Sequence, residues 1–223
     1  MARHAFVMVM LLTLIAMVIG IYLSSFKNIE SHAGFPWQIE RLESGKTRVF
    51  NIVMGETALI DAEKQFKTVA ELTLFSDTAD NLSVEAFFGD VKIAGLKSKM
   101  VMLIDLSQQQ MQQMYQRGAR ISTLGSGTRK VTLSSADIQQ VRQSAIASIT
   151  YLPSIHLDAE LIEKRFGEPA EKITDSQSGA VHWLYPSIGV DIVLSESDKE
   201  VIQYVLPEKF DGLVQPLHSQ PES

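Results

Sequence analysis

An uncharged run of 19 residues near the N-terminus, Ala5 to Leu23, constrains this chain more than any other feature. A helix rises ~1.5 Å per residue, so this run spans ~28 Å, close to the thickness of the hydrocarbon core of a bilayer. Arg3 is the only side chain with a formal charge in the first 26 residues. We therefore expect residues 1–26 to form an N-terminal transmembrane anchor that contacts the membrane through Ala5 to Leu23.

The charges on the two sides of this run predict its orientation. Arg3 and the free amino terminus precede the run, and Lys27 follows it. A short, positively charged N-terminus favours an N-in helix with the rest of the chain on the far side. The alternative is a cleaved signal peptide, which has a shorter apolar stretch of roughly 7–15 residues and a small-residue cleavage site. The nearest such site is Ser31-His32-Ala33, and both interpretations export the remaining residues.

The cysteine and charge content narrow the compartment and the partners. The chain has no cysteine, which excludes disulfides, thiolate metal sites, a cysteine nucleophile and a lipidated cysteine. An exported domain without disulfides fits a bacterial envelope better than a small eukaryotic secreted domain. The net charge of −6 argues against nucleic acid as a partner. We expect a single-pass protein of the inner (cytoplasmic) membrane, N-in, with its domain in the periplasm.

Hydrophobic periodicity after the anchor predicts an α+β fold. Alternating runs typical of strands are interspersed with short amphipathic helices, and turns rich in glycine and proline separate them. We expect the N-terminal transmembrane helix to be followed by one or two helix-plus-antiparallel-sheet modules. We predict an anchor at residues 1–26, a linker at 27–36, a first α+β module at 37–150, a helix plus β-meander module at 151–213 and a disordered tail at 214–223.

The local signals for individual elements are clearest in the middle of the chain. Strand-like runs occupy residues 70–76, 82–94, 99–106 and 146–152. Side chains that can cap a helix N-terminus precede the predicted helices. These caps are Thr57, Ser107, Ser134 or Ser135, and Asp158.

The final unit resembles the BamE-like (SmpA/OmlA) domain of bacterial envelopes. The resemblance rests on a helix that ends in Phe166-Gly167-Glu168-Pro169, on Trp183-Leu184-Tyr185 and on the charged hairpin before the last strand, and it covers about residues 150–210. It implies a helical pair against a three-stranded meander, and a role in binding and assembly rather than catalysis. Gly55-Glu56-Thr57 has the form with which the family's helix often opens, so a diverged tandem of two modules is an alternative. Family members usually carry a lipidated cysteine, which this chain lacks.

The sequence contains no catalytic or metal-binding pattern that outweighs a structural interpretation. His156, Asp158 and Glu160 have a spacing that a metal site could use, but Asp158 is better explained as a helix cap. His182 lies in a predicted strand, where a structural role is favoured. Residues 125–130 lack the spacing of a phosphate-binding loop and fit a hairpin turn. We therefore predict no catalytic, cofactor-binding or metal-binding residues.

Four aromatic residues are the candidates for a partner-binding surface, namely Phe87, Phe88, Trp183 and Tyr185. Such residues are mostly found in cores, but an exposed aromatic side chain on a sheet is a common anchor in interfaces. We expect a non-enzymatic, membrane-anchored protein that binds another envelope protein in assembly or maintenance of the cell envelope. The alternatives are an exported hydrolase or small-ligand-binding domain whose site is assembled from distant residues, and a sensory subunit that needs a partner helix in the membrane.

Overall fold

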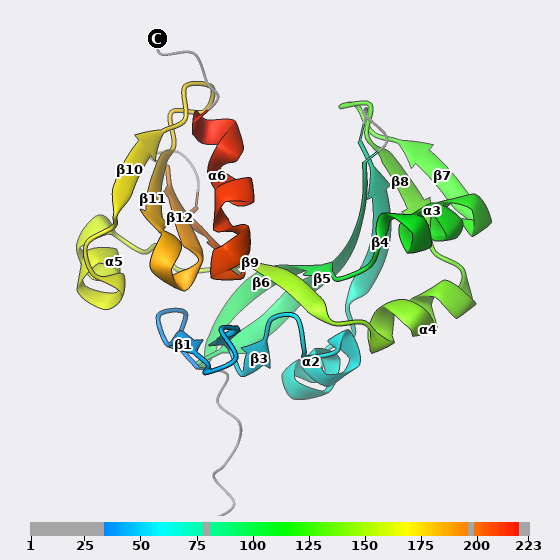
Figure 1. Cartoon of the computed structure of the whole chain (residues 1–223), viewed down its shortest axis with the longest axis horizontal. Helices are drawn as coiled ribbons and strands as arrows, with labels where there is room; N and C mark the ends of the chain where they lie inside the picture. The colour runs from blue at the N-terminus through cyan, green and yellow to red at the C-terminus, as the bar shows by residue number, and fades with distance from the viewer. Residues whose placement is uncertain (1–33, 78–80, 196–198, 219–223) are drawn as a thin grey trace, which may run out of the picture. The chain divides into compact units, whose positions relative to one another are not determined.

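A computed structural model describes residues 34–77, 81–195 and 199–218 of the chain (Figure 1). The predicted anchor from Ala5 to Leu23 lies outside the described residues, as does most of the predicted linker. None of the helices in the described part of the chain is both long and apolar enough to cross a membrane.

The main element of the fold is a sheet of ten strands in which every pair of neighbours is antiparallel. In their order across the sheet the strands are β10 (Glu171–Thr174), β11 (Val181–Tyr185), β12 (Val190–Leu194), β13 (Val201–Tyr204), β9 (Ile146–Pro153), β6 (Leu96–Ile104), β5 (Leu82–Ile93), β4 (Glu71–Ser76), β8 (Arg129–Thr132) and β7 (Arg120–Thr123).

For the part of the chain that the structure describes, the predicted fold class, α+β with one or two helix-plus-antiparallel-sheet modules, is wrong. The described chain is mostly antiparallel sheet, with the ten-stranded sheet, a further three-stranded sheet and short helices. The physical reason is β9, which pairs with β6 on one side and with β13 on the other. This strand joins the two predicted modules into one continuous hydrogen-bonded layer.

Strand β5 shows why these residues form a half-buried strand. Its side chains alternate between buried and more exposed positions, with Val84, Ala86 and Phe88 buried on one side. This period of two is the pattern expected when one face of a sheet packs on a core. The same buried side continues on β6 through Met100 and Met102.

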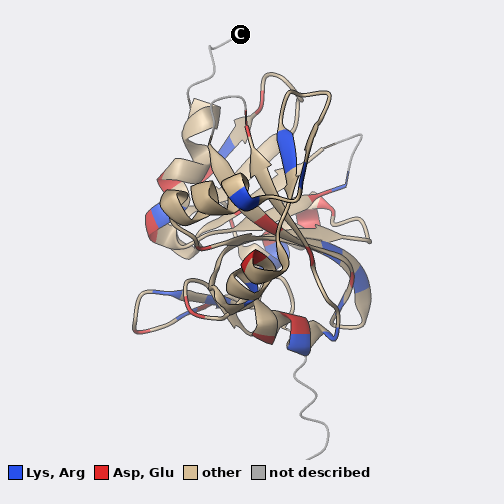
Figure 2. Cartoon of the chain, turned by 90° about the vertical axis from the view of Figure 1, so that its right-hand side faces the viewer, with Lys and Arg blue, Asp and Glu red and all other residues tan. Residues whose placement is uncertain are grey.

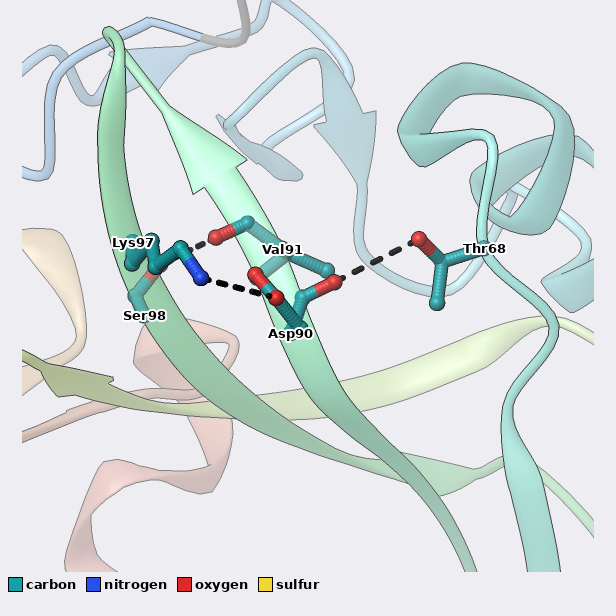
Figure 3. A network of polar contacts seen from close by, with 5 residues as sticks. All are labelled: Thr68, Asp90, Val91, Lys97 and Ser98. Atoms are coloured by element: carbon teal, nitrogen blue, oxygen red, sulfur yellow. Dashed lines mark hydrogen bonds and ion pairs between the residues drawn. The ribbon is translucent and has the colours of Figure 1, made fainter.

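A β-bulge interrupts β5 near its end, and a polar network surrounds it (Figure 3). The Thr68 hydroxyl donates to the Asp90 carbonyl oxygen over 3.4 Å, and the Ser98 hydroxyl donates to the Val91 carbonyl oxygen over 3.4 Å. The Lys97 ammonium lies 3.4 Å from the Asp90 carboxylate. Side chains thus bond backbone carbonyl groups where the ladder is irregular, and the buried carbonyl group of Val91 obtains the partner that a buried backbone group requires.

A small three-stranded sheet precedes the large one. It consists of β1 (Glu40–Arg41), β2 (Thr47–Val49) and β3 (Ile52–Val53). Phe50 and Asn51 connect β2 to β3 and both have positive φ angles, of 52° and 60°. Two consecutive positive φ values match the turn type that joins antiparallel strands of right-handed twist.

Five short α-helices occur among the described residues. They are α2 (Leu59–Phe66), α3 (Gln108–Arg117), α4 (Ser135–Gln143), α5 (Ala159–Phe166) and α6 (Phe210–His218), with the short 3-10 helices η1 (Pro186–Ile188) and η2 (Pro207–Lys209). Side chains from α2, α3, α4 and α5 join the main hydrophobic core with the buried side of the sheet.

The helix caps follow the sequence signals with one exception. Ser107, Ser134 and Asp158 each accept a hydrogen bond from a backbone N–H in the first turn of α3, α4 and α5. Thr57 was predicted to cap α2, but Ala58 occupies that position and its side chain makes no cap hydrogen bond. The Thr57 hydroxyl oxygen instead accepts from the N–H of Val53, because the chain turns sharply after β3.

Helix α6 includes residues 214–218, which belong to the predicted disordered tail. Phe210 and Val214 are buried against Leu184 of β11, and Leu217 packs on the same cluster. Pro216 lies inside this helix. The helix is therefore held by tertiary burial of an apolar stripe, which local composition does not reveal. Residues 219–223 lie outside the described residues.

Candidate functional site

The ten-stranded sheet has a second side, opposite the main core. Directly paired residues of neighbouring strands point to the same side of a sheet. One row of such pairs crosses six strands from β5 to β11 on this second side. It consists of Phe87, Val101, Thr150, Gln203, Asp191 and Leu184.

The two ends of this row meet different surroundings. At the β11 end, Leu184 is buried beneath Phe210 and Val214 of α6. At the β5 end, Phe87 is 37% exposed, and Leu103, two positions after Val101 on β6, is 39% exposed. Helix α6 therefore covers one end of this side of the sheet, while large apolar side chains reach solvent at the other.

We call this exposed area the open face and define it by Phe75 of β4, Glu85 and Phe87 of β5, and Val101 and Leu103 of β6. The register places Phe87 directly opposite Val101 and Glu85 directly opposite Leu103. A Cβ atom added at Gly89 would lie 3.4 Å from the Phe87 ring, so the ring extends over that glycine. Glycine thus leaves room for an aromatic side chain that lies along the strand surface.

Glu85 is the ionisable group within the open face. Partial burial raises the pKa of its carboxyl above the ordinary value of 4.5. The direction of this shift means that the surroundings disfavour the charged form, as an apolar surface does. Beside Glu85, a shallow hollow of about 370 Å³ is lined in part by Phe75, Ser83 and Thr128.

Phe88 lies on the opposite side of β5 from Phe87. It is fully buried and packs edge-on against Phe66 of α2, with ring centroids 5.7 Å apart and an interplanar angle of 75°. Phe88 therefore belongs to the core that holds α2 on the sheet.

Trp183 and Tyr185 are also buried in β11. The Lys172 ammonium lies 3.7 Å from the centroid of the Trp183 ring, a cation–π contact that covers that ring. The Tyr185 hydroxyl donates to the carbonyl oxygen of Gly167 over 3.0 Å, which fixes the end of α5 on the sheet. Of the four aromatic candidates, Phe87 alone has a side chain that a partner could contact directly.

Two histidines form pairs with buried carboxylates. The Nδ1 atom of His182 lies 2.8 Å from the Asp191 carboxylate, and both side chains are largely buried. His156 is exposed and pairs with the buried carboxylate of Glu200. The second Glu200 oxygen accepts from the N–H of Leu157 over 3.1 Å, which orders the chain just before α5. The contacts of Glu200 thus have a structural role at the start of α5.

The described part of the chain has no group of three or more His, Asp and Glu side chains that could hold a metal ion. The hollow beside Glu85 contains carboxylates but no histidine in its lining.

Sequence reasoning missed Val101 and Leu103 as members of the site. The signal that could have found them is the run Lys99 to Ile104, which has apolar residues at both alternating positions from Met100 onward. A strand with one face in water should alternate with polar residues. Apolar residues at both positions are typical of a strand that packs against other residues on both faces.

Comparison of the chain with family models, with curated proteins and with solved structures finds no match.

Proposed function

We propose that this chain is a single-pass, membrane-anchored envelope protein that binds another protein through the open face. Its role would be the assembly or maintenance of the envelope, without catalysis. The membrane run from Ala5 to Leu23 supports the anchoring part of the proposal. The exposure of the apolar side chains Phe87 and Leu103 on neighbouring strands, on the same side of the sheet, supports the binding part.

The exposed apolar area of these two side chains is large enough to contribute to binding. Phe87 exposes 37% of its surface. For an aromatic residue of about 200 Å² this is ~70 Å², and its burial contributes about 2 kcal/mol at ~25 cal/mol per Å². Leu103 is exposed to a similar fraction, 39%, on the neighbouring strand. Aromatic side chains, phenylalanine among them, are enriched at protein interfaces relative to the rest of the protein surface.

Photo-crosslinking in intact cells tests the binding part directly. A benzoyl-phenylalanine side chain is placed at position 87 or at position 103 of the full-length chain. Val69, which is 69% exposed and lies between α2 and β4, is the matched control position. We expect one and the same protein to be crosslinked from positions 87 and 103 but not from position 69. Crosslinking that is equal at the three positions, or absent at positions 87 and 103, would contradict the proposal.

A substitution then tests whether the contact contributes to binding. Phe87→Asp places a charge in the open face without touching the main core, because Phe87 points away from it. We expect the crosslink from position 103 to be lost while the unfolding midpoint stays near that of the wild type. Retention of the crosslink would refute the assignment of this face.

Fractionation tests the anchoring part separately. We expect the full chain to resist carbonate extraction of membranes and its domain to be digested by protease only after the outer membrane has been opened. Release by carbonate, or protection until the inner membrane is lysed, would overturn the anchor or its orientation.

A further inference from the structure

A turn just before β1 brings two aromatic rings together at the surface. The N–H of Gln38 donates to the carbonyl oxygen of Phe35 over 2.9 Å, and the N–H of Phe35 donates to the side-chain oxygen of Gln38 over 2.7 Å. The Phe35 and Trp37 rings stack nearly parallel, with centroids 4.9 Å apart and an interplanar angle of 6°. Phe35 is 40% exposed, and Trp37 is half-buried. The turn therefore presents aromatic surface to solvent.

The residue between the two aromatic residues fixes this turn on the sheet. Pro36 is buried, and its carbonyl oxygen accepts a hydrogen bond from the Tyr204 hydroxyl of β13 over 2.9 Å. Phe35 and Trp37 flank this buried residue, so a bond to the core holds the backbone from which both rings extend. The position of the two rings is therefore set by the fold of the domain.

A positive charge lies against these rings. The guanidinium of Arg165, in the last turn of α5, lies 4.7 Å from the centroid of the Trp37 ring, which is a cation–π contact. Arg165 is exposed, and it forms no ion pair with a carboxylate of the described residues. Glu160 and Glu163 of the same helix lie roughly 140° and 160° around its axis from Arg165. We call Phe35, Trp37 and Arg165 the aromatic–arginine cluster.

The cluster lies close in sequence to the run that we assign to the membrane. Ten residues, 24–33, separate Leu23 from Gly34, and a chain of ten residues spans at most ~33–36 Å. A tether this short holds the cluster near the bilayer surface when the run from Ala5 to Leu23 spans the bilayer. An inference from this distance therefore rests on the anchoring part of the proposed function.

The chemistry of the cluster matches the interfacial layer of a bilayer. Tryptophan is enriched at the level of the lipid headgroups, where its ring is partly in an apolar and partly in a polar environment. A guanidinium binds phosphate with two parallel hydrogen bonds, and phospholipid headgroups carry phosphate. On the open face, by contrast, the ionisable group beside Phe87 is the acidic Glu85, which phosphate would repel. The two exposed aromatic surfaces thus suit different partners.

The rest of the domain provides no broad attraction to a membrane. The chain has a net charge of −6. In Figure 2, Lys and Arg positions (blue) and Asp and Glu positions (red) are interspersed on the side that faces the viewer. General attraction to anionic lipid requires many basic residues next to the membrane. Contact with lipid would therefore depend on the few groups of the aromatic–arginine cluster, and it would not require lipid with a net charge.

We propose that the aromatic–arginine cluster docks the domain on the surface of the bilayer that holds its anchor. Phe35 and Trp37 would enter the interfacial layer, and Arg165 would bind the phosphate of a lipid headgroup. This contact would restrict the rotation of the domain on its tether. The cluster shares no residue with the open face, and the proposal does not require that face to be occupied.

Brominated lipid tests the proposal, because bromine quenches tryptophan fluorescence on contact. The chain has two tryptophans, Trp37 and Trp183, and Trp183 is only 6% exposed in β11. The full chain is reconstituted in phosphatidylcholine liposomes with bromine either near the headgroups or near the acyl ends. Trp37→Phe reports Trp183 alone, so its difference from the wild type gives the signal of Trp37. We expect bromine near the headgroups to quench Trp37 at least twofold and to leave Trp183 unchanged.

Substitutions locate the contact. Arg165→Gln and Phe35→Ser should each reduce the quenching of Trp37 at least twofold, because they remove the phosphate ligand and the outermost ring. Lys164→Gln is the matched control, since it removes the same charge from the adjacent exposed position of α5 and should leave the quenching unchanged. Phe87→Asp on the open face should also have no effect. The substituted side chains are exposed, so we expect the unfolding midpoint of each variant to stay near that of the wild type.

Several results would overturn the proposal. These are equal quenching of the two tryptophans, stronger quenching of Trp37 by bromine near the acyl ends, and equal quenching in Arg165→Gln and Lys164→Gln. A benzoyl-phenylalanine at position 35 that crosslinks a protein in intact cells, in place of lipid, would assign the cluster to a protein partner. Release of the chain from the liposomes by carbonate would overturn the anchoring part of the proposed function together with this proposal. A chain that resists carbonate but shows no quenching of Trp37 would overturn the docking alone.

Discussion

Tyr204→Phe removes a hydroxyl group that joins the beginning of the domain to the ten-stranded sheet. The Tyr204 side chain is fully buried in β13, and its hydroxyl donates to the carbonyl oxygen of Pro36 over 2.9 Å. Phenylalanine keeps the ring and its edge-on contact with Phe50, whose centroid lies 5.5 Å away. The substitution therefore tests one buried hydrogen bond with little change in packing.

The expected loss of stability follows from the burial of both partners. A buried hydrogen bond contributes about 1 kcal/mol net, and a buried acceptor that loses its donor costs about 1–3 kcal/mol. Pro36 is buried as well, so water does not readily replace the lost donor. We expect Tyr204→Phe to lower the free energy of unfolding by about 2 kcal/mol.

Urea unfolding of the full chain in mild detergent, followed by tryptophan fluorescence, measures this loss. Tyr115→Phe is the matched control, because the Tyr115 hydroxyl accepts from the Arg129 guanidinium over 3.2 Å in an exposed pair. We expect the control to change stability by less than about 0.5 kcal/mol. Amide exchange at Trp37 should also become faster in Tyr204→Phe. Equal effects of the two substitutions would refute the idea that Tyr204 fixes the start of the domain.

Three further predictions concern single positions. Gly189→Ala should lower the free energy of unfolding by well over 2 kcal/mol, because φ is +69° and a Cβ atom would collide with a backbone carbonyl oxygen. Gly45→Ala, where φ is +80° but the surrounding space is open, should lower it by about 1 kcal/mol. Equal losses for the two substitutions in urea titrations would contradict this prediction. The pKa of Glu85 is raised in the fold by burial, so its charged form destabilises the fold as pH rises above 4.5. Glu85→Gln should therefore be more stable than the wild type at pH 7 but not below about pH 4, and a pH-independent difference would count against it. Burial and the negative charge of Glu163 raise the pKa of Tyr185 to about 12, so stability should fall from pH 10 to 12 as the unfolded chain ionises. Tyr185→Phe should reduce that slope by up to about 1.4 kcal/mol per pH unit in alkaline urea titrations, and an unchanged slope would refute the assignment.

Local sequence patterns predict the individual strands of the first half well. The run predicted at 82–94 corresponds to β5, Leu82–Ile93, and the run at 70–76 corresponds to β4, Glu71–Ser76. Alternation of buried and exposed side chains is a local property of each strand, so a single sequence contains it. The caps of α3, α4 and α5 were predicted for the same reason, because a cap bonds backbone groups within one turn.

The pairing of strands is not local, and there the prediction fails. The predicted module boundary at residues 150 and 151 cuts through β9, Ile146–Pro153, which is the strand that joins the two halves. Its partners β6 and β13 lie far away in sequence on either side. Turn signals indicate where a strand ends, but they do not indicate which edge it joins.

The candidate site shows the same limit at the level of single residues. Alternation places Phe87 and Phe88 on opposite sides of β5 but does not say which side is covered. The answer depends on α2, whose Phe66 packs on Phe88, and on α6, which reaches Leu184 but leaves Phe87 exposed. Both helices cover the sheet through tertiary contacts, so the exposure of Phe87 could not be predicted from its own segment.

The second side of the sheet is covered by a helix at one end and exposed at the other, and this difference supports the view that the open face has a partner. An antiparallel sheet can leave one side in water when that side is polar. At the β11 end the side is apolar, and α6 covers it with Phe210 and Val214. At the β5 end the same side carries Phe87, Val101 and Leu103 beside Glu85, and Phe87 remains exposed although burial already raises the pKa of Glu85. A partner at this end would bury the apolar side chains, as α6 does at the β11 end. It would also raise the pKa of Glu85 further, because it would exclude more water from the carboxyl.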